Sequence, residues 1–432
     1  MNNRALTLVV VIFGLLLGAL VLQQGDLAWM SLPFLIYLGL GILLAPAPDE
    51  IHLLAARTVE KTSGGQGKTS IEVNVAVTNR GAMLEHLSIS DDPQPGVQPV
   101  DGRLSQSASL MPGESTKLGY TFQAERGSFA WKALHVTASD PFDLIEVRLA
   151  LPAAAEVQAL PEVKKIRPFP LRTKRTLTSP GSIPARRGGS GTNFWGIREY
   201  HPGDPLQRLD WRLTARHPRQ FFTKEFEQEA MADIGLILDA RGKTNLQLGD
   251  DCLFEHSARA AASLAEVFLR QGNRVSLLVW GEPMVSLFPG YGKAQLNRIL
   301  HALAQVTPNS DGSLNDLHFV PVQMFSSHSL ILVISPLAAN DSQLFPRLRA
   351  YGYQVMLISP DPLDYARSQL PVDDAGRMAC RLTRLERQLE IARIRQLWIP
   401  VIDWSVNQPL SPLVRQVLSK AHVEIERSRT LG

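Results

Sequence analysis

Two uncharged stretches occupy almost all of the first fifty residues and constrain the structure that this end of the chain can adopt. The first is Ala5–Leu22, and the second is Leu27–Ala47, after the short link QQGD. Each approaches the ~20 residues that a helix needs to cross the ~30 Å hydrocarbon core of a bilayer. An Asp near the bilayer centre costs roughly 2.5–3.5 kcal/mol, so we expect Asp26 in the turn outside the membrane. The pattern predicts a transmembrane helical hairpin with spans at about 5–23 and 27–47.

Basic residues near the ends of the two spans predict their orientation. Arg4 precedes the first span, Arg57 and Lys61 follow the second, and the turn holds no basic residue. The positive-inside bias therefore predicts an inner-membrane protein with two spans, whose termini and soluble domains are cytoplasmic. A cleaved signal peptide is the alternative. It is disfavoured because no small-x-small site ends the first run and a second span follows at once.

Composition excludes several classes of protein. The chain has 432 residues, which is enough for two or three domains. Its net charge of +3, from 44 basic and 41 acidic residues, is too small to indicate a nucleic-acid partner by itself. The two cysteines, Cys252 and Cys380, are far apart, which argues against a disulfide framework and against a zinc site.

Residues 51–160 have the pattern of an all-β domain. Hydrophobic residues alternate with polar or small ones at Ile71, Val73, Val75 and Val77, and the run then meets the turn sequence Asn-Arg-Gly. This alternation is typical of a half-buried strand. Similar segments recur up to residue 151, at a spacing that favours an immunoglobulin-like β-sandwich.

Residues 161–191 have the composition of a linker. They combine prolines and a Gly-Gly-Ser-Gly run with eight basic residues: Lys164, Lys165, Arg167, Arg172, Lys174, Arg175, Arg186 and Arg187. A solvated, extended connector is the favoured interpretation. Attraction to anionic lipid is the alternative, but a whole domain separates these residues from the spans in sequence.

Strands alternate with helices over residues 231–432, which predicts a doubly wound α/β domain. The expected helices are Phe254–Gln271, Leu296–Leu303, Arg381–Leu397 and Pro412–Ala421. The third is amphipathic, with Leu382, Leu385, Leu389 and Ala392 along one stripe. The expected strands are Asp233–Ala240, Val275–Trp280, Leu330–Ser335, Val355–Ser359 and the segment WIPVIDW.

Asp239 stands where the first of these strands ends, in a unit that resembles the start of the von Willebrand factor A fold. The metal site of that fold uses Asp-x-Ser-x-Ser, whose hard oxygen ligands suit Mg²⁺. Here Arg241 and Lys243 replace the two serines, and Ser335 is followed by Pro336 where a later Asp is expected. Cations repel a divalent ion and offer it no lone pair. We therefore expect no metal or cofactor, and a surface ion pair of Asp239 with Arg241 or Lys243 worth ~0–1 kcal/mol.

The segment 192–230 carries the densest motif in the chain. Its residues are Phe194, Gly196, Arg198, Glu199, Tyr200, Pro202, Gly203, Asp204, Arg208, Asp210, Trp211, Ala215 and Arg216. With the basic, aromatic strand after it, this pattern resembles the conserved core of the domain of unknown function 58 (DUF58) family. The upstream Arg-Gly and Asp-Pro-Phe sequences within Glu125–Val147 add to the resemblance, although Asp143 stands where a Gly is usual.

Three interpretations of this segment remain open. In the first it is a semi-buried clasp, in which arginines pair with Glu199, Asp204 and Asp210 around a Pro-Gly turn while aromatic residues pack on the α/β domain. In the second it is an exposed charged face that grips another protein. In the third it is a catalytic centre at His201 and Asp204, which is disfavoured because no Ser or Cys nucleophile is near in sequence.

The family resemblance implies a protein partner, because such proteins commonly occur with MoxR-type AAA+ ATPases. The leading expectation is a non-enzymatic membrane scaffold or adaptor that recruits such an ATPase for complex assembly or chaperone-like work. Two alternatives stay open at this point. One is a cell-envelope binding module with extracytoplasmic domains, and the other is an uncharacterised hydrolase.

Overall fold

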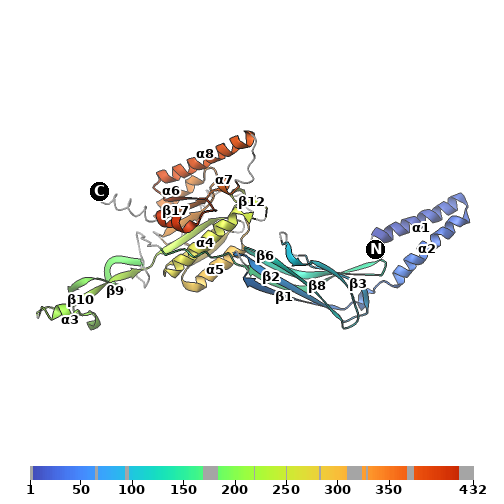
Figure 1. Cartoon of the computed structure of the whole chain (residues 1–432), viewed down its shortest axis with the longest axis horizontal. Coiled ribbons are helices and arrows are strands. Elements are labelled where there is room, and N and C mark those ends of the chain that lie inside the picture. The colour runs from blue at the N-terminus through green and yellow to red at the C-terminus, as the bar shows by residue number, and fades with distance from the viewer. Residues whose placement is uncertain are drawn as a thin grey trace. The chain divides into compact units, whose positions relative to one another are not determined.

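The structure is a computed structural model. It describes residues 3–63, 67–92, 97–168, 183–217, 219–249, 251–281, 284–308, 324–326, 329–366 and 374–417. The chain divides into a first unit, Met1–Ala159, and a second unit, Leu160–Gly432 (Figure 1).

The first unit begins with two apolar helices, α1 (Asn3–Leu22) and α2 (Gly25–Leu43). Both are long and apolar enough to cross a membrane, judged by length and composition. The turn between them is shorter than the sequence suggested, because α2 already begins at Gly25 and holds Asp26 in its first turn. A short 3₁₀ helix, η1 (Pro48–Glu50), leads into the β-sheets.

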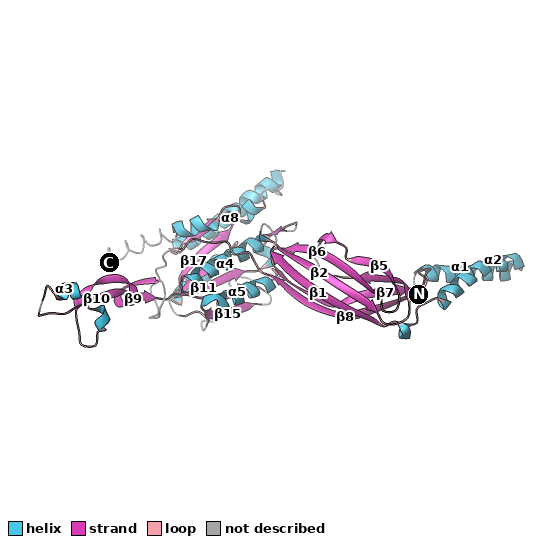
Figure 2. Cartoon of the chain, turned by 60° about the horizontal axis from the view of Figure 1, so that its bottom comes forward, coloured by secondary structure: helices cyan, strands magenta, loops and turns pink. Residues whose placement is uncertain are grey.

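Two four-stranded antiparallel sheets make up the rest of the first unit (Figure 2). One has the order β1-β2-β6-β4, and the other has the order β5-β3-β7-β8. The strands are β1 (Leu53–Ser63), β2 (Thr69–Asn79), β3 (Leu84–Ser90), β4 (Pro99–Gly102), β5 (Ser105–Leu110), β6 (Ser115–Ala124), β7 (Gly127–Ser139) and β8 (Glu146–Ala159).

Alternating side chains of the two sheets form one hydrophobic cluster. On β2 these are Ile71, Val73, Val75 and Val77, each at most 1% exposed. Their even spacing places them on one face of the strand, as the alternation in the sequence predicts.

A buried ion pair interrupts this apolar interior. Arg57 of β1 contacts Asp91, and both side chains are 0% exposed. The hydroxyl of Tyr120 donates to Asp91 Oδ2 at 2.8 Å, and the Arg57 guanidinium lies 5.5 Å from the centre of the Trp131 ring. Burial, followed by the bond to Asp91, raises the pKa of Tyr120. The phenol therefore stays protonated and remains a donor.

The β7–β8 loop contacts α2 within the first unit. Asp140 holds the loop together by accepting backbone N–H bonds from Phe142, Leu144 and Ile145 at 2.6–2.9 Å. The ring of Phe142 lies 4.7 Å from that of Tyr37 on α2. Asp143 has a φ of +57°, a conformation that Gly adopts at less cost than other residues. A Gly at this position, which the family resemblance leads one to expect, would adopt this conformation at less cost.

The second unit contains a six-stranded sheet in the order β15-β14-β11-β16-β17-β18. All neighbouring pairs are parallel except β14 with β15. The strands are β11 (Asp233–Asp239), β14 (Arg274–Trp280), β15 (Val285–Gly290), β16 (Leu330–Ile334), β17 (Gln354–Pro360) and β18 (Val401–Trp404). The antiparallel edge strand β15 was missed in the sequence.

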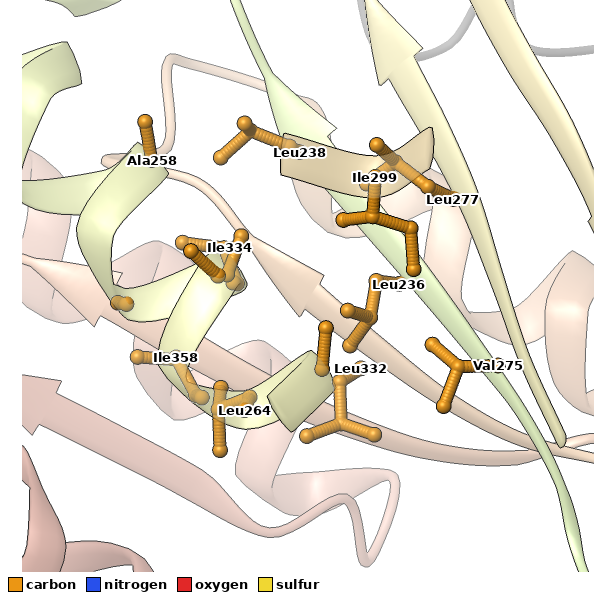
Figure 3. Close-up of a cluster of buried hydrophobic side chains, with 14 of the residues drawn as sticks. Leu236, Leu238, Ala258, Leu264, Val275, Leu277, Ile299, Leu332, Ile334 and Ile358 are labelled. Atoms are coloured by element: carbon orange, nitrogen blue, oxygen red, sulfur yellow. The ribbon is translucent and has the colours of Figure 1, made fainter. Parts of the chain in front are cut away.

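Helices cover both faces of this sheet. They are α4 (Leu253–Arg270), α5 (Gly292–Gln305), α6 (Leu344–Ala350), α7 (Pro362–Tyr365) and α8 (Asp374–Gln396). Side chains of α4 and α5 pack on one face with Leu236 and Leu238 of β11 (Figure 3). Side chains of α6 and α8 pack on the other face with Ile237. The expected last helix is helical over 410–417, and its final residues, 418–421, lie outside the described part of the chain.

Smaller elements complete the second unit. Strands β9 (Ile183–Glu199) and β10 (Phe222–Ala230) form a separate two-stranded sheet, and β12 (Gln247–Leu248) pairs with β13 (Asp251–Cys252). The remaining elements are α3 (Trp211–Thr214), η3 (Leu206–Arg208), η4 (Gly242–Thr244) and η6 (Asp341–Gln343).

The segment expected to be a solvated linker departs from that expectation at both ends. Ile166 is 4% exposed and belongs to the core beside α4, and the backbone N–H of Lys164 donates to Ser263 Oγ at 2.9 Å. At the other end, β9 already begins at Ile183. The middle of the expected linker, residues 169–182, lies outside the described residues, as do the side chains of Arg186 and Arg187.

Gly235 in the middle of β11 provides a test of this packing. A Cβ atom at this position would lie 2.5 Å from Phe325 Cε1 and 2.6 Å from Ile331 Cδ1. We expect Gly235→Ala to lower the free energy of unfolding of the second unit by about 1–3 kcal/mol, the usual cost of overpacking. Urea unfolding monitored by amide hydrogen exchange in β11 measures it. The same substitution at Gly196, where nothing lies within 4 Å of the added atom, is the control.

Candidate functional site

The family-like segment forms a hairpin that carries a long, folded loop at its end (Figure 1). Strand β9 pairs with β10 from Glu199 opposite Phe222 onwards. The loop between them folds back on the strands, because Leu209 bridges to Thr223 and the N–H of Asp210 donates to the carbonyl of Phe222 at 2.8 Å. The motif residues thus come together within the hairpin itself.

Arg198 is the central side chain of this loop. Its guanidinium binds both carboxylate oxygens of Asp204, at 2.8 Å and 2.7 Å, and its Nε donates to Glu225 Oε1 at 2.8 Å. Such a planar fork fixes direction as well as distance. One arginine therefore joins the end of β9, the turn that follows it and the start of β10.

The Pro202–Gly203 turn is held by the same carboxylate. Gly203 has a φ of +111°, and the N–H of Asp204 donates to the carbonyl of His201 at 3.0 Å. Asp204 Oδ2 also accepts the backbone N–H of His201 at 2.9 Å, while the His201 ring contacts the carbonyl of Glu199 at 3.0 Å. The carboxylate of Asp204 thus binds Arg198 and backbone, in a structural arrangement.

Glu199 and Tyr200 add contacts across the base of the loop. Glu199 Oε1 accepts from Gln220 Nε2 at 3.1 Å, and the N–H of Tyr200 donates to the carbonyl of Phe221 at 2.8 Å. The rings of Tyr200 and Phe221 meet edge to face, 6.3 Å apart. Arg208 ends the short helix η3, and its carbonyl accepts from the hydroxyl of Thr223 at 3.3 Å.

Asp210 caps the single-turn helix α3. Its Oδ1 accepts the N–H groups of Arg212 and Leu213 at 3.1 Å and 3.0 Å, which are orphan donors at a helix start. Trp211, the first residue of α3, is 64% exposed. The expected packing of Trp211 on the α/β domain is therefore wrong, because the capped turn directs this residue to the surface. Arg216, after α3, is exposed as well.

The Arg198–Asp204 pair predicts a pH dependence. Hydrogen bonds from Arg198, and then from the N–H of His201, hold the pKa of Asp204 below its usual value of about 3.9. A lowered carboxyl pKa means that the pair stabilises the loop above that value and is lost as pH falls through the lowered pKa. We expect the carboxyl carbon of Asp204, followed by NMR, to titrate below pH ~3.9. In Arg198→Gln the midpoint should rise, and an unchanged midpoint would contradict the assignment.

The second candidate site lies where β11 ends. Asp239 is 0% exposed, and Arg241 is among the largest fully buried side chains of the described residues. Asp239 Oδ1 accepts from Arg241 Nε at 2.9 Å, and its Oδ2 accepts from Arg241 Nη2 at 2.7 Å. The expected surface ion pair is therefore corrected to a buried one, because the loop after β11 turns the guanidinium inward. Lys243 is exposed and takes no part in this pair.

Among the further residues that contact this pair are Asp341 and Ser335, and sequence reasoning assigned a role to neither. Asp341, from the segment after β16, accepts from Arg241 Nη1 at 3.2 Å and Nη2 at 2.7 Å. Ser335 donates to Asp239 Oδ2 at 2.7 Å. An acidic residue thus does follow β16, six residues after Ser335. The chain returns to the site through Leu337 and Asn340, which both have positive φ.

This cluster occupies the position where doubly wound sheets commonly bind ligands. The helices after the neighbouring strands β11 and β16 cover opposite faces of the sheet, which makes their carboxyl ends a topological switch point. Burial alone lowers the pKa of Arg241, but its bonds to Asp239 and Asp341 outweigh burial and raise that pKa. Burial raises the pKa of Asp341, and Arg241 opposes this shift. The guanidinium therefore stays charged and fills the space between the two carboxylates.

Comparison with protein families matches a large part of the second unit. Residues 196–397 match the family model described as protein of unknown function DUF58. This match supports the DUF58 family for the chain. The matched region contains the hairpin loop, the buried Arg241 cluster and most of the six-stranded sheet.

Similar curated proteins carry no described activity. The chain is 26% identical over 286 residues to "Uncharacterized protein YeaD" of Bacillus subtilis, which is 62% of this chain and 65% of that protein. It is 28% identical over 137 residues to "Uncharacterized protein Rv1480" of Mycobacterium tuberculosis, which is 30% of this chain and 41% of that protein. The matches thus span less than two thirds of either relative.

Two solved structures illustrate the likeness to known folds, and both have low TM-scores. Proximal thread matrix protein 1 from the mussel byssus has a TM-score of 0.28 at 13% identity, with 44% of this chain and 46% of that chain covered. The putative ApaA protein from Bordetella pertussis has a TM-score of 0.17 at 19% identity, with 25% and 93% covered. At these TM-scores neither likeness bears on fold or function.

Proposed function

We propose that the chain is a non-enzymatic scaffold of the bacterial inner membrane that recruits a MoxR-type AAA+ ATPase. In this proposal α1 and α2 span the membrane, and an immunoglobulin-like sandwich and a von Willebrand factor A-like domain both lie in the cytoplasm. The ATPase supplies the nucleotide chemistry. The chain holds the ATPase at the membrane and provides its docking surface.

The observation that carries this proposal is the surface at the end of the hairpin. Five exposed tryptophan, phenylalanine or arginine side chains lie within eleven residues there: Trp211, Arg212, Arg216, Arg219 and Phe221. We call this group the hairpin tip. The side chains of its three arginines form no ion pair with any residue in the described part of the chain, whereas Arg198 is fully paired. Exposed aromatic and arginine side chains are the types most enriched at protein interfaces.

The internal contacts of the loop support the same interpretation. Asp204 is held by Arg198, Asp210 caps α3, and Glu225 binds Arg198, so the nearby carboxylates are engaged within the hairpin. These contacts hold the loop in one conformation, while the three arginines of the hairpin tip remain available to an acidic partner. Preorganised surfaces of this kind bind at a lower entropic cost. The internal contacts of the clasp thus hold the loop that carries the proposed partner surface.

The geometry favours a docking role over hydrolysis at His201. A hydrolytic site needs a base that an acidic side chain orients and a nucleophile within reach of that base. Here Asp204 contacts His201 through the backbone N–H, and the ring faces the carbonyl of Glu199. Substituting both residues without loss of an in vivo phenotype would remove the hydrolase alternative.

The test is retention of the ATPase on the full chain. The detergent-purified chain is immobilised and mixed with a MoxR-type ATPase from the same genome, under ATP and under ADP. We expect retention by the wild type, and at least a roughly tenfold loss in Arg212→Glu/Arg216→Glu, since charge reversal at an interface centre costs more than about 1.4 kcal/mol. The matched control is Lys293→Glu/Arg298→Glu on the exposed side of α5, which should retain the ATPase. Absence of retention by the wild type under both nucleotides would refute the proposal.

Topology is tested separately. Reporter fusions placed after residue 50 should be active only as cytoplasmic reporters. Activity only of a periplasm-dependent reporter would instead support the alternative of a cell-envelope module with extracytoplasmic domains.

A further inference from the structure

The longest helix of the second unit exposes an apolar stripe. Met378, Leu382, Leu385 and Leu389 of α8 are 67%, 59%, 57% and 58% exposed. Ala375 and Ala392 extend the same stripe at its two ends and are exposed too. The stripe that the sequence revealed in this helix thus faces away from its own domain. We call these six residues the α8 stripe.

The spacing of the α8 stripe is that of a coiled-coil seam. Successive members are separated by three, four, three, four and three residues, from Ala375 to Ala392. This is the a/d pattern of the heptad repeat, with Ala375, Leu382 and Leu389 at a and Met378, Leu385 and Ala392 at d. At ~1.5 Å per residue the seam is roughly 26 Å long.

The opposite side of α8 is fixed to its own domain. Ile391 and Ile394 are at most 3% exposed and pack in the core with α6. Arg387 donates to Ser359 and pairs with Asp403 at 2.8 Å. Figure 1 shows one end of α8 reaching beyond the neighbouring α6 and α7. The helix is therefore already formed by its own domain. Short isolated helices must fold when they associate, which costs free energy, and α8 avoids this cost.

Charges beside the seam identify the partner as a second copy of the chain. Arg381 occupies a g position and Glu386 the following e position, and both are exposed. In a parallel, in-register pair of heptad helices, each g residue faces the e residue five positions later on the other helix. Arg381 of each copy would then face Glu386 of the other, twice by symmetry. The other such pairs, Asp374 with Ala379 and Gln388 with Arg393, place no like charges together.

We propose that α8 forms a parallel, two-stranded coiled coil with α8 of a second copy, so that the protein is a twofold-symmetric homodimer. Two identical patches that face each other across a twofold axis are the commonest arrangement of homodimers. The proposal does not depend on the identity of any ATPase partner, because α8 and the hairpin tip are different surfaces.

Cysteine crosslinking of the full chain in lipid nanodiscs, assembled so that two copies can share a disc, tests the seam. In the Cys252→Ser/Cys380→Ser background, Leu385→Cys places a thiol at a d position, where two copies would meet. We expect an oxidised dimer. Native Cys380 lies at an f position, away from the seam. The Cys252→Ser chain is therefore the matched control, and it should form no disulfide-crosslinked dimer under the same oxidant. A monomer for Leu385→Cys, or dimers only in mixtures of Leu382→Cys and Leu385→Cys chains, would overturn the parallel dimer.

Charge exchange gives a second, independent test by light scattering of the detergent-purified chain. Arg381→Glu alone and Glu386→Arg alone should each weaken dimerisation, because each places like charges across the seam. The double variant Arg381→Glu/Glu386→Arg should restore it. Leu382→Gln/Leu389→Gln should weaken it at least roughly tenfold without unfolding the protomer, since both side chains are exposed there. A wild-type monomer, or equal dimerisation by all variants, would refute the proposal.

Discussion

Arg241→Met is expected to lower the free energy of unfolding of the second unit by about 3–5 kcal/mol, the usual cost of removing one partner from a buried ion pair. The substitution keeps most of the side-chain volume but leaves Asp239 and Asp341 in the interior without their counter-ion. Both carboxylates are at most 1% exposed, so water cannot replace the guanidinium. Urea unfolding of the detergent-purified chain, monitored by amide hydrogen exchange in β11 and β16, measures the change.

Lys243→Met is the matched control for this experiment. It removes a cation of the same loop, only two residues along the chain, but an exposed one. We expect a change within about 0.5 kcal/mol. The triple variant Asp239→Asn/Arg241→Met/Asp341→Asn should recover part of the loss, because no charge then remains buried. A loss below about 1 kcal/mol for Arg241→Met would show that the pair contributes no more than a surface one.

Asp91→Ala is expected to have a comparable effect in the first unit, also about 3–5 kcal/mol. It leaves the fully buried Arg57 without its counter-ion and the Tyr120 hydroxyl without its acceptor. The bond from Arg57 to the carbonyl of Ala153 and its contact with Trp131 do not replace a negative charge. Hydrogen exchange should speed up in β2 and β6 and stay unchanged in β11, because the second unit has a core of its own.

Asp92→Ala controls for this second substitution. Asp92 is the next residue in sequence and is exposed, so its removal should change the free energy of unfolding by less than about 0.5 kcal/mol. Equal effects of the two substitutions, or exchange that also speeds up in β11, would contradict the interpretation that Asp91 stabilises one unit through one buried pair.

Strand and helix positions in the second unit were largely predictable from sequence. Buried parallel strands need continuous apolar runs, and β11, β14, β16 and β17 begin and end within one residue of the expected positions. Strand β15 was not predicted because it lies at an edge of the sheet. Its residues are partly exposed, and a Pro lies inside the short run. Its apolar residues Val285 and Leu287 pack only partly buried against the core, so the sequence of this short strand carries little signal.

The orientation of α8 shows a different limit. Periodicity reveals that a helix has an apolar stripe, but it does not say which side faces the domain. In α8 the domain side also contains Arg387 and Glu390, which are buried because the ends of β17 and η6 offer them partners. These partners lie far away in sequence. The exposed stripe therefore became recognisable only once the tertiary contacts were known.

The two candidate sites were predictable to different degrees for a related reason. In the hairpin, Arg198 and Asp204 are six residues apart, so a turn between them suffices to suggest a pair. In the strand-end cluster, Arg241 and Asp341 are 100 residues apart, and only the pairing of β11 with β16 brings them together. Local sequence identified Asp239 and Arg241 but could not tell that a third side chain closes the cluster and buries it.

The closed cluster at the end of β11 carries its positive charge differently from a site that holds a bound ion. A bound ion dissociates, so a domain that relies on one responds to chelators and to ionic conditions. The positive charge between Asp239 and Asp341 belongs instead to Arg241. It is part of the chain and cannot dissociate on dilution. Arg241 therefore supplies, between Asp239 and Asp341, a positive charge that does not depend on a dissociable ion.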